Sequence, residues 1–131
     1  MIRRIHHIGL AVDDLDQAIT LYQGLGATLL RRGEQESEAM AYALLHAGHS
    51  ELELMTSSDP ESAVGKFLAR RGQGVHHVAY AVPDVAAAAA LLSGSGYELV
   101  GSVRTGLHGT PIAFLHPRSM DGVLTELVQE D

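Results

Sequence analysis

The sequence predicts an α+β fold of two tandem βαβββ modules that form a curved mixed sheet around a cleft. The main evidence is an internal repeat: residues 6–30 (HHIGLAVDDLDQAITLYQGLGATLL) align without gaps onto residues 76–100 (HHVAYAVPDVAAAAALLSGSGYELV). In both copies a short apolar run precedes a helical pattern, and further extended runs follow it. The length of 131 residues suits one compact domain better than two independent ones.

Each module is expected to open with a strand and a helix. The apolar runs at residues 8–12 and 78–82 are short and rich in residues that favour strands. Asp14 and Asp84 stand where a helix N-cap belongs. Glycines follow each helical pattern, where a left-handed residue closes the last turn: Gly24, Gly26, Gly94 and Gly96. The two modules therefore begin with the same strand and helix.

The remainder of each module is expected to be extended. The predicted strands lie at residues 38–46 and 50–55 in the first module and at 111–116 and 122–129 in the second, separated by the turn-forming segments AGHS and PRSMDG. Residues 62–71 form a connector helix that ends at Gly72. We therefore place module 1 at about 1–58, the connector at about 59–73 and module 2 at about 74–131, all within a single domain, 1–131.

The composition argues against several classes of function. The formal net charge of −7 disfavours binding to nucleic-acid phosphate, which needs clustered Lys and Arg. No apolar run reaches membrane-spanning length, and the N-terminal segment MIRRIHHIGLAV lacks the features of a signal peptide. We therefore expect a cytoplasmic protein whose partners include neither a membrane nor a nucleic acid. With no cysteine, any bound metal must have nitrogen and oxygen ligands.

Histidine and glutamate recur at matching positions of the two modules and indicate a divalent-metal site. His7 and His77 are the second histidine of each pair, and alternation along a strand turns the first histidine to the opposite face. Glu53 and Glu126 each lie inside an otherwise apolar last strand, where a carboxylate is costly to bury unless something pairs with it. Two imidazoles and two carboxylates suit Co, Mn, Fe, Ni or Zn and leave positions open for water or substrate.

A structural role is the alternative for each of these residues. A histidine at a strand start is more often hydrogen-bonded within the fold than bound to a metal, and motif matches include false positives. The presence of both residue types in both modules favours the metal site, because packing alone does not require it. Glu53 is the weakest member of the set, since a shift in strand register would bring Glu51 into its place.

The chain resembles the vicinal oxygen chelate superfamily, which includes glyoxalases, bleomycin resistance proteins and dioxygenases. The segments that carry the resemblance are HHIGLAV, SAVGKFLARRGQGVHHVAYAV and HGTPIAFLHPRSMDGVLTELVQ. Within the superfamily the sequence is most similar to the methylmalonyl-CoA epimerases, over nearly the whole chain. The resemblance places the family's metal ligands on His7, Glu53, His77 and Glu126. Some members have Gln at the position of Glu53.

The resemblance implies a metal-dependent inversion at C2 of methylmalonyl-CoA, between the 2R and 2S forms. The divalent cation, whether Co, Mn, Ni, Fe or Zn, acts as a Lewis acid on the developing enolate. Inversion needs one proton acceptor and donor on each face of C2. The resemblance assigns one such role to Glu126 and points to Glu38, on the third strand of module 1, for the other. A gapless alignment puts Ala43 there instead, and Glu38 then belongs to a solvated charged stretch, residues 31–38.

Other expectations concern the substrate and the assembly. His108, Arg118 and Ser119 are candidates for contacts with the acyl-CoA substrate, although exposed loop basicity is the commoner explanation for Arg118. His116 is expected to order the turn that begins at Pro117. The resemblance also implies a homodimer, and closed two-fold dimers are the commonest soluble assembly.

Three other functions on the same fold stay open, because a fold does not determine a function. A glyoxalase-type isomerase uses similar ligands to move a proton in a glutathione hemithioacetal. An extradiol-type dioxygenase needs only two histidines and one glutamate for its iron, so a fourth protein ligand argues against it. A metal-free binding or resistance protein usually lacks the ligand positions, whereas all four are present in this chain.

Overall fold

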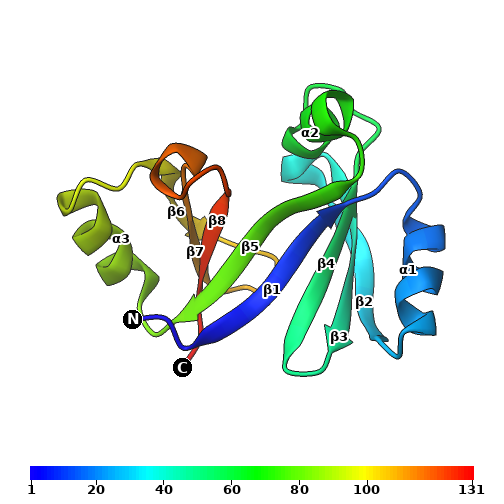
Figure 1. Cartoon of the computed structure of the whole chain (residues 1–131), viewed down its shortest axis with the longest axis horizontal. Helices are drawn as coiled ribbons and strands as arrows, with labels where there is room; N and C mark the ends of the chain where they lie inside the picture. Colours follow the sequence, from blue (N-terminus) through cyan, green and yellow to red (C-terminus); the bar gives the residue numbers. More distant parts are fainter. The chain divides into compact units, whose positions relative to one another are not determined.

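The structure of the chain, a computed structural model, describes residues 1–131. Figure 1 shows two βαβββ series joined by a helix, which confirms the predicted α+β fold. No helix is both long and apolar enough to cross a membrane. The first series and the connector comprise β1 (Arg4–Ala11), α1 (Leu15–Gly24), β2 (Thr28–Gln35), β3 (Met40–Ala47), β4 (Ser50–Thr56) and α2 (Ala63–Arg71). The second comprises β5 (Gly74–Val82), α3 (Val85–Gly94), β6 (Leu99–Thr105), β7 (Pro111–Leu115) and β8 (Thr125–Gln129).

The chain divides into two compact units, one formed by His7–His76 and the other by Met1–His6 together with His77–Asp131. The strand order is β1-β4-β3-β2 in the first unit and β5-β8-β7-β6 in the second. In each unit the last strand pairs in parallel with the first, and the other pairs are antiparallel. The repeat in the sequence is therefore also a repeat in strand topology.

The two repeat helices begin at the predicted capping residues. The Asp14 carboxylate accepts a hydrogen bond from the Gln17 backbone N–H at 3.0 Å, and the Asp84 carboxylate accepts one from the Ala87 N–H at 3.0 Å. Each bond satisfies one of the donors that the first turn of a helix leaves unpaired. The expected N-caps of α1 and α3 are thus confirmed.

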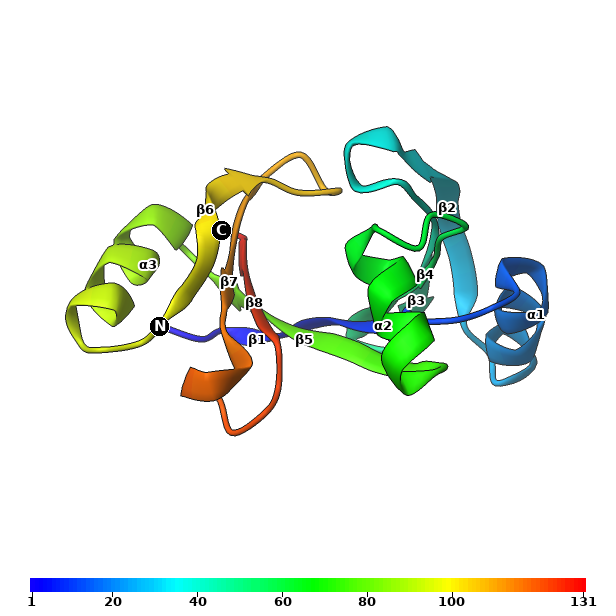
Figure 2. The same ribbon diagram turned by 90° about the horizontal axis from the view of Figure 1, so that it is seen from above.

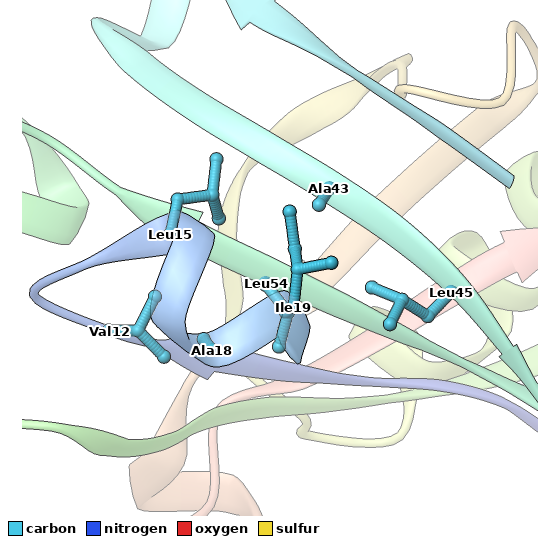
Figure 3. Close-up of a cluster of buried hydrophobic side chains, with 7 residues drawn as sticks. All are labelled: Val12, Leu15, Ala18, Ile19, Ala43, Leu45 and Leu54. Atoms are coloured by element: carbon cyan, nitrogen blue, oxygen red, sulfur yellow. The ribbon is translucent and has the colours of Figure 1, made fainter. Parts of the chain in front are cut away.

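The core of the His7–His76 unit lies between α1 and the sheet. Figure 3 shows the α1 side chains directed at side chains from β3 and β4, in a cluster that comprises Val12, Leu15, Ala18, Ile19, Ala43, Leu45 and Leu54. Burying a Leu or Ile side chain contributes about 1.5–3 kcal/mol to stability. Leu54 belongs to this core, so alternation along β4 turns its neighbour Glu53 to the other face of the strand.

The second unit repeats this arrangement. Figure 2 shows α3 beside β6 and β7, and the buried cluster comprises Val82, Val85, Ala88, Ala89, Ala113 and Leu127. Leu127 of β8 packs in this cluster, so its neighbour Glu126 faces away from α3. The same helix-to-sheet packing therefore sets the direction of the glutamate in both units.

Two strands start later than the sequence predicts. The strand expected from residue 38 begins at Met40, because Glu36–Glu38 form a single 3₁₀ turn and Ala39 adopts a left-handed conformation with φ 51° and ψ 46°. The strand expected from residue 122 begins at Thr125. Asp121 and Gly122 both have positive φ there, which breaks the extended backbone. Both errors follow from turns that hydrophobic patterning does not reveal.

Gly65→Ala is expected to destabilise the protein by about 2–3 kcal/mol, because a methyl group there overpacks a buried site. A Cβ at Gly65 would lie 2.0 Å from the Asp59 carbonyl oxygen. Gly94→Ala is the matched control, since a Cβ at that helical position meets nothing within 4 Å and alanine favours a helix more than glycine does. Urea unfolding of both variants checks the prediction, and equal stabilities would contradict it.

Candidate metal centre

The first half of the candidate centre is a buried pair, His7 on β1 and Glu53 on β4. The register of these parallel strands places Glu53 opposite Gly9, two residues beyond His7 and therefore on the same face of β1. The His7 Nε2 and Glu53 Oε2 atoms are 2.9 Å apart. The structure thus selects Glu53, rather than Glu51, as the partner of His7.

The second half repeats this geometry in the other unit. Glu126 on β8 lies opposite Ala79, two residues beyond His77 on β5. The His77 Nε2 and Glu126 Oε1 atoms are 3.2 Å apart. The edge of the His77 ring also meets the Phe114 ring, with centroids 5.6 Å apart and planes at 84°. Phe114 therefore supports the imidazole orientation, a role that alternation and motif spacing did not predict.

Both His–Glu pairs are buried, which limits how their charges can be stabilised. The side chains of His7 and Glu53 are 1% and 8% exposed, and those of His77 and Glu126 are 3% and 7% exposed. A buried carboxylate is stable only when a hydrogen-bond donor or a cation compensates its lost hydration. No buried side-chain nitrogen or oxygen in the chain lacks a hydrogen-bond partner. Each carboxylate is therefore compensated by the imidazole beside it, and the paired nitrogen and oxygen atoms are of the kinds that bind metal ions.

The donor chemistry fits a divalent cation. All four residues are buried, and each offers one atom that can ligate a metal. Imidazole nitrogen and carboxylate oxygen together suit Mn, Fe, Co, Ni and Zn, whereas sites for soft metals rely on sulfur ligands. Each unit supplies one donor of each kind, and the chain has no cysteine.

Comparison with known proteins identifies the family. The Glyoxalase/Bleomycin resistance protein/Dioxygenase superfamily matches residues 6–114. This chain belongs to that superfamily. Its relatives include the ethylmalonyl-CoA/methylmalonyl-CoA epimerase of Cereibacter sphaeroides, which is 32% identical over 98% of this chain and 99% of the relative. The resemblance to the methylmalonyl-CoA epimerases is therefore confirmed.

Solved structures of such epimerases superpose closely on this superfamily member. A variant of the Streptomyces coelicolor methylmalonyl-CoA epimerase in complex with 2-nitronate-propionyl-CoA has a TM-score of 0.93 and 38% identity, covering 99% of each chain. A methylmalonyl-CoA epimerase in complex with methylmalonyl-CoA and NH4+ also has a TM-score of 0.93 and 38% identity, covering 99% of this chain and 96% of that one. The likeness thus extends over the full length of the fold.

Glu38 is not part of the buried group that includes His7 and Glu53. The sequence predicted this glutamate on the third strand, and that placement is wrong. Glu38 is the last residue of the 3₁₀ turn in the hairpin loop between β2 and β3, and its side chain is exposed. The left-handed residue Ala39 then separates it from β3. Glu38 is therefore held by a loop, in contrast to the strand-borne histidines and glutamates.

The remaining candidates make contacts within the second unit. His108, in the loop between β6 and β7, meets the His6 ring edge-on with centroids 4.7 Å apart. The Arg118 guanidinium donates to both Glu98 carboxylate oxygens at 3.2 and 2.8 Å, which holds the pKa of Glu98 below its usual value. Ser119 Oγ accepts a hydrogen bond from the Glu98 N–H at 2.8 Å. Arg118 and Ser119 thus tie the start of β6 to the turn after β7, and their substrate contacts stay a prediction.

His116 has the structural role that the sequence suggested. Its Nδ1 accepts a hydrogen bond from the Arg118 backbone N–H at 3.0 Å. This bond caps the 3₁₀ turn Pro117–Ser119. The imidazole therefore orders the turn.

Glu130→Gln is expected to reduce stability at neutral pH but not in acid. The Arg4 guanidinium donates to both Glu130 oxygens at 2.8 and 2.6 Å, and this contact lowers the pKa of Glu130, with His6 and His108 adding smaller effects. A carboxylate with a lowered folded-state pKa stabilises the fold above its unfolded-state pKa, and the effect is lost as pH falls through the folded-state pKa. Because both side chains are about one-third exposed, solvent screening limits the loss to about 0.5 kcal/mol at pH 7.

Urea unfolding at pH 7 and at a pH below the lowered folded-state pKa of Glu130 measures this difference. An unperturbed glutamate titrates near pH 4.3, so the second pH must lie well below that value. The two proteins should converge in stability at the lower pH. An equal difference at both pH values would show that the loss does not come from the charge of Glu130.

Proposed function

We propose that this chain is a metal-dependent epimerase that inverts C2 of methylmalonyl-CoA and interconverts its 2R and 2S forms. The observation that carries the proposal is the pair of equivalent buried His–Glu contacts, one in each unit of a superfamily member. Its full-length relatives named as methylmalonyl-CoA epimerases support the same reaction and an acyl-CoA substrate.

We propose further that His7, Glu53, His77 and Glu126 hold one divalent cation, which is Co, Mn, Ni, Fe or Zn. Two neutral imidazoles and two carboxylates balance the charge of such an ion. When bound, the cation supplies positive charge that stabilises the enolate oxygen of the deprotonated thioester. The protein holds the ligands in place, because all four lie on strands. The residues on the opposite face of these strands pack into a hydrophobic core.

Two carboxylates complete the proposed mechanism. The C2 hydrogen of methylmalonyl-CoA lies between a thioester and a carboxylate, so its removal leaves a delocalised enolate. The Glu126 carboxylate takes this proton from one face of C2, the C–H electron pair moves into the thioester carbonyl, and Glu38 in its acid form returns a proton to the opposite face. The reverse direction exchanges the two roles. Glu38 lies on the exposed hairpin loop between β2 and β3, so this role requires the loop to bring its carboxyl group to the substrate.

The finer features of the proposal concern binding and assembly. We propose that the two modules act as one domain, that the protein works as a cytoplasmic homodimer, and that His108, Arg118 and Ser119 contact the acyl-CoA. Arg118 offers a planar group that matches carboxylate or phosphate. Binding at that position would compete with its present contact to Glu98.

Proton exchange at C2 tests the proposed function. Metal-stripped protein is incubated with methylmalonyl-CoA in D2O with and without Co(II), and NMR follows the C2 signal of each isomer. Metal-dependent deuterium incorporation with inversion is the expected result. If metal-loaded protein gives no exchange but isomerises a glutathione hemithioacetal, the glyoxalase-type alternative replaces the epimerase.

A further inference from the structure

The loop that carries Glu38 has little packing to hold it. Glu36–Ala39 connect β2 and β3, and none of the residues in the 3₁₀ turn is buried. One side of the loop borders a groove of about 660 Å³ whose lining includes Glu36, Ala39, Met40, Ser57 and Ser58. Hydrogen bonds, more than apolar contacts, must therefore determine where this loop lies.

The left-handed conformation of Ala39 costs free energy, which other contacts of this residue must offset. Its φ of 51° and ψ of 46° are left-handed, a region that an L-residue with a Cβ occupies at a penalty. The Ala39 N–H donates to the Glu36 carbonyl at 3.0 Å, which closes the 3₁₀ turn. Its carbonyl oxygen accepts a hydrogen bond from the Ser57 hydroxyl at 2.5 Å. Ser57 thus contacts the residue immediately after Glu38 from another part of the chain.

The Ser57 side chain continues the contacts between the two segments beyond the last backbone pair of β3 and β4. The antiparallel register between β3 and β4 finishes at Ala41 and Thr56, and Ser57 is the next residue. Its hydroxyl has one proton, which the Ala39 carbonyl accepts. The same oxygen accepts a hydrogen bond from the Asp59 N–H at 3.1 Å. The Ser62 hydroxyl lies 2.8 Å from this oxygen and 2.8 Å from the Asp59 carbonyl oxygen. The Ser57 side chain therefore links the Ala39 carbonyl to the segment that precedes α2.

The hydrogen bonds around Ser57 extend to the N-terminus of α2. Ser62 Oγ is the N-cap of α2 and accepts from the buried Gly65 N–H at 2.9 Å. Gly65 lets the Asp59 carbonyl approach closely, since a Cβ there would leave only 2.0 Å to that oxygen. The first turn of α2, the end of β4 and the Glu38 loop are therefore joined through Ser62 and Ser57.

We propose that Ser57 is a positioning residue that fixes the Glu38 loop and so sets the rate of proton transfer on one face of the substrate C2. The inference rests on the proposed function, in which Glu38 serves one face and Glu126 the other. It predicts an asymmetric defect: loss of the Ser57 hydroxyl slows proton removal from one isomer only. A general loss of structure would slow both isomers.

Ser57→Ala tests this inference, with Ser58→Ala as the matched control in the same segment. For metal-loaded Ser57→Ala we expect C2–H exchange to fall about tenfold for one isomer, consistent with the loss of one hydrogen bond, and to stay near wild type for the other. Glu38→Gln should slow the same isomer. Ser57→Thr, which keeps the hydroxyl, should restore the rate, and Ser58→Ala should exchange both isomers as wild type does.

Amide hydrogen exchange at Ala39 gives a readout that does not depend on activity. The amide should exchange about tenfold faster in Ser57→Ala than in Ser58→Ala. Equal slowing of both isomers, unchanged rates, or an unaltered Ala39 amide would each overturn the positioning role. A wild-type protein without C2 exchange overturns the epimerase proposal itself, and with it the catalytic part of this inference, whatever the amide shows.

Discussion

Glu126→Gln is expected to reduce epimerisation by about a thousandfold, within the range that general acid–base groups contribute. The amide keeps the shape of the side chain and an oxygen that can ligate a metal, but it cannot accept the C2 proton. The substitution therefore removes the base while preserving the packing of a residue that lies buried beside His77. The rate constant for inversion of each isomer, measured with Co(II) at saturation, checks the prediction.

Glu53→Gln is the matched control for this result. Glu53 has the same contact with a histidine, 2.9 Å from His7 Nε2, and the same degree of burial as Glu126. Because Glu126 is assigned a proton-transfer role and Glu53 is not, Glu53→Gln should keep most of the activity once metal is bound. Equal losses in the two variants would reduce Glu126 to a metal ligand and require another base.

His77→Ala is expected to weaken Co(II) binding by at least about 100-fold, since replacing even a residue outside the ligand set costs 10- to 100-fold. Calorimetric titration of the metal-stripped protein should give one Co(II) per chain for the wild type. Binding to the folded state also raises stability, by about 2.7 kcal/mol at a metal concentration 100 times the Kd. The rise in thermal midpoint on adding Co(II) should therefore be largely lost in His77→Ala.

His76→Ala controls for the removal of a neighbouring imidazole. The His76 ring packs against Phe67 at a centroid distance of 5.0 Å and is not among the proposed ligands. This variant should bind Co(II) with the affinity of the wild type, although its stability in the absence of metal falls. A metal-binding loss as large as that of His77→Ala would show that the four-ligand assignment is wrong.

The sequence by itself determined the repeated module and the kinds of residue that the candidate site uses. The alternation of strand residues, the capping aspartates Asp14 and Asp84, and the glycines after each helix are local signals, and each acts within a few positions of the chain. An internal repeat then doubles the evidence, because His7 and His77, like Glu53 and Glu126, occupy equivalent strands. For these reasons the α+β fold and the presence of a histidine and a glutamate at equivalent strands of both modules were predictable without coordinates.

Only the tertiary structure decided which partners meet and how the loops lie. The choice of Glu53 over Glu51 depends on the register between β1 and β4, which pairs residues more than 40 positions apart. The placement of Glu38 on a loop depends on the left-handed Ala39, whose carbonyl is held by Ser57 eighteen residues later. Such contacts leave no periodic trace in the sequence, because they depend on backbone conformation and strand pairing that arise when distant segments fold together.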